Sequence, residues 1–245
     1  MNYRLVSTAA AAGGLAIIFA LALLGQTKGG YSAPKHAWDK EHADLSGIWQ
    51  PKANAGDDVE KLLVGDKKLP YAGKAADKQK ENAKNKAKAD PVNRCWLPGV
   101  PRLAYMNYPF QIFQTATYIN FVSEYAHVYR QVFMDGSKHI DDWPGGFWLG
   151  DSRGRWDGDT LAVDVVGFND LTWFDKAGNY HGDKLHVEER YTRTAPDVMT
   201  YEATITDPEV YSKPWKISTT LALHKEPNFR LLEHECQDLA IPATQ

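Results

Sequence analysis

The chain has little cysteine and no recognisable catalytic motif. Its 245 residues include two cysteines, Cys95 and Cys236, too few for a four-thiolate zinc site, an all-cysteine iron–sulfur cluster or a disulfide-dense scaffold. No Gly-x-Ser-x-Gly elbow, His-Glu-x-x-His helix, dinucleotide fingerprint or phosphate loop occurs. The sequence therefore indicates architecture more clearly than chemistry, and it predicts neither a cofactor nor a metal ion.

An excess of one sign of charge is also absent. The 28 Lys and Arg residues against 31 Asp and Glu residues give a net charge of −3, which excludes a strongly basic nucleic-acid coat. With 43% hydrophobic residues, and with 8 Trp, 12 Tyr and 9 Phe, the chain can bury one large core or two small ones. We therefore expect a globular protein that binds no nucleic acid.

The N-terminal stretch has no charge between Arg4 and Lys28, and residues 5–25 are almost entirely apolar or small. A helix of this length would reach about 31 Å, close to the ~30 Å hydrocarbon core of a bilayer. The alternative is a secretory signal, whose apolar region is usually about 7 to 15 residues long and ends at a small-residue cleavage site. Good cleavage sites are lacking, so we predict a retained membrane anchor over residues 1–27 that contacts the bilayer through residues 5–25.

The anchor also carries signals of orientation and packing. Arg4 on its short side favours a cytoplasmic N-terminus, which predicts a single-pass inner-membrane protein with its C-terminal domain in the periplasm. Ala9, Gly13 and Gly14 would let the helix pack closely against another membrane helix, although plain signal peptides share this pattern. We therefore expect the partners to be subunits of an integral membrane complex.

Two polar segments precede or interrupt the body of the chain. Residues 28–44 contain glycines, a proline and several charges, typical of a tether. Residues 59–90 form a Lys-rich insert: from Lys61 to Lys88 there are nine Lys against three acidic residues. Residues 71–89 are rich in helix formers, but their apolar residues are mostly alanine. We therefore expect a solvated helix or a mobile surface segment here. A basic patch that rests on anionic lipid or on an acidic partner is the alternative.

The body, residues 45–238, has the pattern of β structure, and a tail follows at 239–245. Apolar and polar residues alternate through 199–206 and 215–223, as on strands with one buried face. Further strands are expected at 45–49, 110–115, 118–125, 127–133, 147–155, 160–168, 184–194 and 229–236, with turn residues between them. No long helical pattern separates these strands, so we predict a mainly β, antiparallel up-and-down barrel, with a two-sheet sandwich as the alternative.

Four segments of the body carry a family resemblance. They are Asn93–Arg102 (NRCWLPGVPR), Gly150–Leu161 (GDSRGRWDGDTL), Glu188–Tyr191 (EERY) and Glu235–Cys236. Together they resemble a large family of uncharacterised exported bacterial proteins with a lipocalin-like β-barrel, over most of residues 45–236.

The resemblance implies a barrel and a disulfide between Cys95 and Cys236, whereas the residues alone leave two free thiols as an alternative. It implies no reaction. Family members usually carry a more convincing signal peptide, and the residues after Cys236 depart from the usual family tail. Both departures allow this chain to be an anchored subunit.

Adjacent carboxylates occur in one predicted strand. Glu188 and Glu189 would lie on opposite faces, so one must point toward the barrel interior. A buried carboxylate needs a partner, which Arg190, Arg193 or Arg130 could supply as a bidentate pair. We interpret the pattern as an ion pair that fixes the barrel, with a polar anchor for a ligand as the alternative.

Catalytic and metal-binding sets are weaker hypotheses. His186 with Glu188 or Glu189 could supply acid–base chemistry, and so could His139 with Asp141. Two further sets invite a metal hypothesis but match no ligand spacing, and we interpret them as turn and strand residues. They are His181, Asp183 and His186, and Asp151, Asp157 and Asp159.

These features predict a non-catalytic, membrane-anchored accessory or structural subunit. Its periplasmic barrel would brace a larger inner-membrane complex, of which a photosynthetic or respiratory complex is an example. The alternative is a periplasmic lipocalin-like protein that holds a small apolar ligand inside the barrel. An enzyme using Glu188 or Glu189 with His186 is the third hypothesis.

Overall fold

The structure, a computed structural model, describes residues 31–141, 143–234 and 236. The predicted anchor, including Ala9, Gly13 and Gly14, lies outside the described residues, as does the tail at 239–245. Among the described residues, no helix is both long and apolar enough to span a membrane. The anchor therefore stays a prediction.

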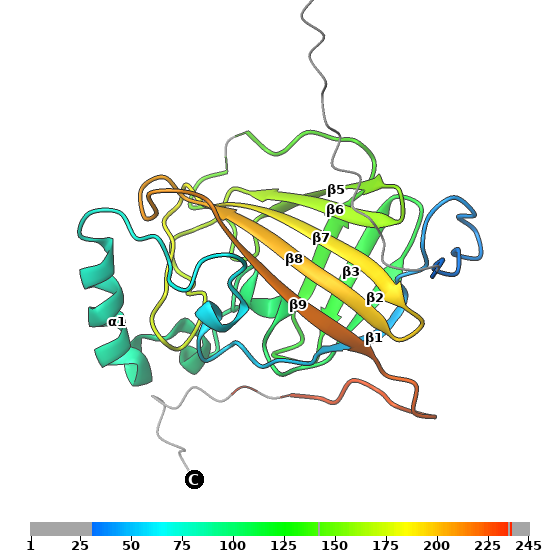
Figure 1. Cartoon of the computed structure of the whole chain (residues 1–245), viewed down its shortest axis with the longest axis horizontal. Coiled ribbons are helices and arrows are strands. Elements are labelled where there is room, and N and C mark those ends of the chain that lie inside the picture. Colours follow the sequence, from blue (N-terminus) through cyan, green and yellow to red (C-terminus); the bar gives the residue numbers. More distant parts are fainter. Residues whose placement is uncertain (1–30, 142, 235, 237–245) are drawn as a thin grey trace, which may run out of the picture. The chain divides into compact units, whose positions relative to one another are not determined.

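Nine strands form a closed barrel in which each strand pairs with its neighbours in the sequence (Figure 1). The strands are β1 Gly47–Pro51, β2 Phe110–Gln114, β3 Tyr118–Ser123, β4 Tyr129–Phe133, β5 Asp151–Asp157, β6 Thr160–Val166, β7 His186–Ala195, β8 Val198–Thr206 and β9 Trp215–Leu223. Pairing of β1 with β9 closes the barrel. The predicted mainly β barrel is confirmed, and the two-sheet sandwich is wrong.

One strand pairing departs from the antiparallel prediction. β4 and β5 run parallel and meet at Phe133 and Arg153, whereas the other pairings between neighbouring strands are antiparallel. Parallel neighbours require the chain to return to the same end of the sheet before the second strand begins. Residues 134–141 and 143–150, which we call the excursion, make this return, so the strand predicted from residue 147 begins only at Asp151 (Figure 1).

The strand predicted at 229–236 is not formed. An isolated bridge joins Tyr125 to His234, and the Leu232 side chain is 70% exposed. Because β9 already pairs with β8 and β1, it offers no free edge for a further strand. The segment runs along the outside of the barrel instead (Figure 1).

The chain after β9 is tied back by a disulfide. Cys95 and Cys236 are bonded, with their Cα atoms 5.5 Å apart. This confirms the pairing implied by the family resemblance and excludes the alternative of two free thiols. The bond joins the last described residue to the short helix that follows the Lys-rich insert.

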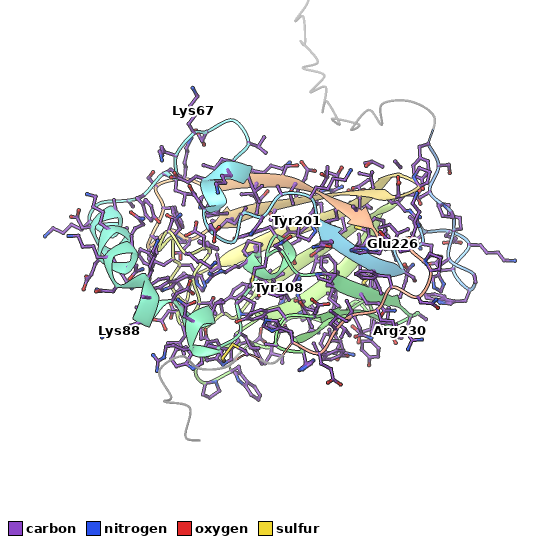
Figure 2. The ribbon with its side chains drawn as sticks, turned by 90° about the horizontal axis from the view of Figure 1, so that it is seen from below. Lys67, Lys88, Tyr108, Tyr201, Glu226 and Arg230 are labelled. Atoms are coloured by element: carbon purple, nitrogen blue, oxygen red, sulfur yellow. A yellow bond between two sulfur atoms is a disulfide. The ribbon has the colours of Figure 1, made fainter. Side chains whose placement is uncertain are left out.

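Helical segments lie between β1 and β2. They are the 3₁₀ helices η1 Val59–Leu62, η2 Pro91–Arg94 and η3 Arg102–Ala104 and the α-helix α1 Ala75–Ala89. No residue of α1 is buried, and Gln79 and Asn82 attach it by donating hydrogen bonds to backbone carbonyls of the turn at 176–178. Figure 2 shows Lys88, near the end of α1, at the periphery of the molecule. The Lys-rich insert thus contains a surface helix.

Aromatic and aliphatic side chains fill the barrel. Trp49, Phe121, Tyr201 and Trp215 are each less than 5% exposed. Val100, Pro101, Leu103 and Ala104, the last two from η3, lie against the interior, and the space left beside them is about 10 Å³, enough for about one water molecule. The described residues therefore leave no ligand-sized cavity at this place inside the barrel.

Asp175 fastens η1 to the turn that supports α1. Its carboxylate is fully buried and accepts hydrogen bonds from Val59 N at 2.7 Å and from Asn179 N and Nδ2 at 3.1 and 2.6 Å. Burial, only partly offset by these donors, raises the pKa of Asp175 from 3.8 to about 6. The folded protein therefore holds this proton over a pH range in which the unfolded chain releases it.

We expect Asp175 to lower the stability of the fold as pH rises from about 4 to about 6. A pKa difference of about two units between the folded and unfolded chain corresponds to about 3 kcal/mol in the free energy of unfolding. This contribution is fully lost once Asp175 is ionised in both states. In Asp175→Asn, which cannot ionise, this part of the pH dependence should disappear. Urea unfolding at pH 4 and at pH 7 measures it, and an equal difference between wild type and variant at both pH values would contradict the expectation.

Candidate functional site

Strands β4, β5 and β7 bring a charged pair into the barrel. Arg130 on β4 and Glu189 on β7 are 5% and 1% exposed. The Arg130 guanidinium donates Nη1–H to Glu189 Oε1 at 3.2 Å and Nη2–H to Oε2. It also donates from Nε and Nη2 to Ser152 Oγ on β5, at 3.1 and 3.0 Å. The pair is bidentate and buried, as predicted, and Arg130 is the partner of the inward carboxylate.

Two tyrosines complete this interior cluster. The hydroxyls of Tyr191 and Tyr201 donate to Glu189 Oε1 at 3.0 and 2.9 Å, and Tyr201 lies within the barrel (Figure 2). Burial and the nearby carboxylate raise the pKa of both tyrosines well above the usual value, so both stay neutral donors. Although burial opposes it, the Glu189 charge raises the pKa of Arg130. Because these groups occupy its oxygens, Glu189 is not free to act as a base.

A second polar cluster lies on the outer face of β5–β7 and is centred on Asp164. His139, from the excursion, places Nδ1 2.9 Å from Asp151 Oδ2 and Nε2 2.8 Å from Asp164 Oδ2. His186 Nε2 lies 2.5 Å from Asp164 Oδ1. We call these four residues the Asp164 cluster. Both ring nitrogens of His139 thus lie within hydrogen-bond distance of a carboxylate.

The Asp164 cluster holds the excursion against the barrel. Partial burial acts to raise the pKa of Asp164, but hydrogen bonds from His186 and His139 outweigh it and lower that pKa. The backbone N–H of Ile140 adds a bond to Asp151 Oδ2 at 3.1 Å. The carboxylates thus act as anchor points for the loop.

The predicted acid–base sets are not formed. His186 contacts Asp164 rather than a glutamate. Glu189 points inward, and Glu188 is exposed on the same outer face as His186. Likewise His139 contacts the carboxylates of the Asp164 cluster, and Asp141 is exposed further along the excursion. The error has one cause: the true partners lie 12 to 25 residues away in the sequence, on neighbouring strands, and are brought close only by the strand register.

The suggested metal sets do not converge either. His181 is buried, with Nε2 2.6 Å from Thr172 Oγ1 and Nδ1 2.8 Å from the carbonyl oxygen of Gly182, and burial lowers its pKa. His186, in contrast, lies on the outer face of β7. Within the described residues, no group of three or more His, Cys, Asp or Glu side chains has an arrangement suited to a metal ion.

The three aspartates of the other metal set have separate roles. Asp151 belongs to the Asp164 cluster, Asp157 pairs with Arg190 at 2.7 Å and Asp159 pairs with Lys35.

Sequence reasoning missed a surface on the outer side of β2–β4, which we call the aromatic face. Its outward side chains carry no charge, and four of them are aromatic. They are Gln111, Phe113, Tyr118, Asn120, Val122, Tyr129, Gln131 and Phe133. The signal was present in the sequence, since the polar-side positions of these strands hold no Asp, Glu, Lys or Arg.

The clefts outside the barrel interior include two of more than 500 Å³. One, of about 700 Å³, lies beside the disulfide and is lined by Tyr108, Tyr125 and His234, among others. The other, of about 550 Å³, lies between the excursion and the chain after β6. Both sizes fall within the range of small-molecule sites.

Searches of the sequence against protein-family models and against curated proteins find no match. The functional conclusions below therefore rest on the geometry of the described residues.

We expect Glu189→Gln to destabilise the fold by about 3–5 kcal/mol, because it leaves the buried Arg130 charge without a counter-ion. Glu188→Gln, one residue away on the exposed face, is the matched control and should change stability by about 0.5 kcal/mol or less. Urea denaturation of both variants measures the difference. Equal costs for the two substitutions would show that the pair is not a structural element.

We also expect Asp164→Asn to loosen the excursion without unfolding the barrel. Loss of the charge-assisted bonds to His139, worth roughly 1.5–3 kcal/mol, should speed hydrogen exchange of the Ile140 amide about ten-fold or more. Amides of β7 and β8 should keep their protection. Asp157→Asn, which removes a different pair on the same strands, is the control, and an unchanged Ile140 exchange rate would contradict the anchoring role.

Proposed function

We propose that this chain is a non-catalytic accessory subunit that braces a larger inner-membrane assembly, with the aromatic face as its docking surface. One observation carries the proposal: eight neighbouring outward side chains on β2–β4 include no charged residue, in a chain with 24% charged residues. Phe113 and Tyr129, at 45% and 54% exposure, are the most accessible of its aromatic residues.

The composition of this face is that of an interface core. Protein interfaces are depleted of charge at their centre and enriched in Tyr, Trp and Phe, which supply contact area at low entropic cost. The outer face of β7–β9 differs, since it carries Glu188, Arg190, Glu202 and Lys216. The contrast favours a protein partner whose matching surface is also uncharged, and it gives the barrel one side for docking and one for solvent.

The interior supports a scaffold role. Because the space beside Arg130 and Glu189 is about 10 Å³, a lipocalin-like ligand at this place would have to displace packed side chains. A barrel cross-linked by a buried ion pair and tied by a disulfide is rigid, which suits a subunit that holds its partners in place. The anchor at residues 5–25 would keep this scaffold beside the membrane and is part of the proposal. The predicted tether at 28–44 is not a free linker over its described part, because Ala33 and Ala43 are buried in the core.

Site-directed photo-crosslinking in native membranes tests the docking surface. A photoreactive residue at Phe113 or Tyr129 should form a crosslink to an integral membrane subunit. The same residue at Thr204 or Ser218, outward positions on β8 and β9, should form little or none. Equal crosslinking from both sides, or a chain that always migrates alone in mild detergent, would refute docking through this face.

A charge placed on the face should release the chain. Tyr129→Lys should reduce the fraction that co-migrates with the assembly about ten-fold or more, because an interface core tolerates an unpaired charge poorly. Thr204→Lys is the matched control, and both variants should unfold at the same urea concentration as wild type. N-terminal sequencing of the native protein tests the anchor separately, and a start beyond Gly25 would remove that part of the proposal alone.

A further inference from the structure

The excursion forms one wall of the 550 Å³ cleft, which we call the excursion groove. Side chains of the excursion and of the chain after β6 face each other across it. The six residues that matter below are Ile140, Asp141, Trp143, Asp170, Leu171 and Asp183. Nothing in the docking proposal uses this groove.

Backbone contacts make the groove a built feature. Phe147 N donates to Gly167 O at 2.7 Å, and Asn169 N donates to Phe147 O at 2.9 Å. Gly146 has a φ of +65°, and a Cβ there would come within 2.6 Å of the backbone of residues 168 and 169, so the two walls touch where only glycine fits. Nearer the start of the excursion, the Asp164 cluster holds His139 against the barrel.

Exposed apolar side chains gather at the groove. Of the eight large hydrophobic residues that are exposed in the described chain, three line it: Ile140 at 48%, Trp143 at 55% and Leu171 at 44%. Trp143 stacks on Phe147, with ring centroids 5.1 Å apart and planes 19° from parallel. One face of the indole is thus supported, and more than half of the side chain remains open to a ligand. These three apolar side chains therefore lie beside one another in a cleft rather than singly over the surface.

The negative charge of the groove favours a positively charged ligand. Asp141, Asp170 and Asp183 line it and are all exposed. Lys184 is the one cation among the lining residues, and it lies 3.5 Å from Asp183. The lining therefore carries two negative charges in excess, beside the type of aromatic ring that binds cations best.

We infer that the excursion groove binds a small organic cation, with an alkylammonium head over the open face of Trp143 and carboxylates beside it. Ile140 and Leu171 would contact the alkyl groups, which explains why apolar and acidic residues are mixed at one place. An anion would be repelled, and a neutral ligand of the same shape would gain only the apolar contacts. Free amines and the choline head of a lipid share this chemistry.

Calorimetric titration of the full chain in nonionic detergent micelles tests the inference, with choline as the probe. Its neutral isostere, 3,3-dimethylbutan-1-ol, should bind about ten-fold more weakly or not at all, because it lacks the charge. Dihexanoylphosphatidylcholine below its micellar concentration distinguishes a lipid ligand from a free amine. Tighter binding than that of choline indicates the head of a lipid, and weaker binding indicates a free cation.

Variants locate the site. Trp143→Ala should weaken choline binding about ten-fold, and Asp170→Asn should weaken it several-fold. Trp38→Ala, which removes another half-exposed tryptophan (48%), is the matched control and should leave binding unchanged. Because these side chains are exposed, all variants should keep the unfolding midpoint of the wild type. No measurable choline binding, equal affinity for the isostere, or equal effects of the two tryptophan substitutions would overturn the inference.

Discussion

The buried pair of Arg130 and Glu189 is the constraint on which the rest of the barrel depends. Charges inside a protein are tolerated only when they are paired, hydrogen-bonded and shielded from water. Here Ser152, Tyr191 and Tyr201 complete the hydrogen bonding, and four strands supply the five residues. Slipping any of these strands by one residue would turn its member of the cluster outward and leave the others unpaired. The cluster therefore specifies strand register, and its closed surroundings leave only about 10 Å³ of free space beside it.

The topology then decides where the outer sites lie. Arg130 on β4 reaches Ser152 on β5, and these two strands run parallel, so the chain between them must cross back over the barrel. That crossing is the excursion, which carries His139 to the Asp164 cluster and Trp143 to the groove. In an antiparallel barrel a short hairpin would replace it, and neither feature would exist. The Asp164 cluster and the excursion groove are thus consequences of one parallel pairing.

Local patterns in the sequence predicted what is local in the fold. Alternation predicted that one of Glu188 and Glu189 points inward, because a strand turns successive side chains to opposite faces, and the structure shows that it is Glu189. The strand at 229–236 was predicted wrongly, since only the closed pairing of β9 shows that no edge remains. The partners of His139 and His186 were missed for a similar reason: Asp164 comes from a strand whose neighbours cannot be read from spacing. The uncharged positions of β2–β4 were visible in the sequence. That they lie side by side in one surface follows only from the strand register.

The aromatic face and the excursion groove differ in charge, and the difference favours permanent burial of the face and reversible occupancy of the groove. An uncharged face gains most when it is covered permanently, because burying it removes apolar area from water without desolvating an ion. An acidic groove behaves differently: its carboxylates are well solvated when it is empty, so occupancy by a cation is readily reversed. Phe133 on the aromatic face stacks with Arg153, 4.5 Å from its ring centroid, and Arg153 in turn pairs with Asp151 of the Asp164 cluster at 3.1 Å. Arg153 therefore links the aromatic face to the Asp164 cluster, so a partner that moves Phe133 would act on the residues that anchor the excursion.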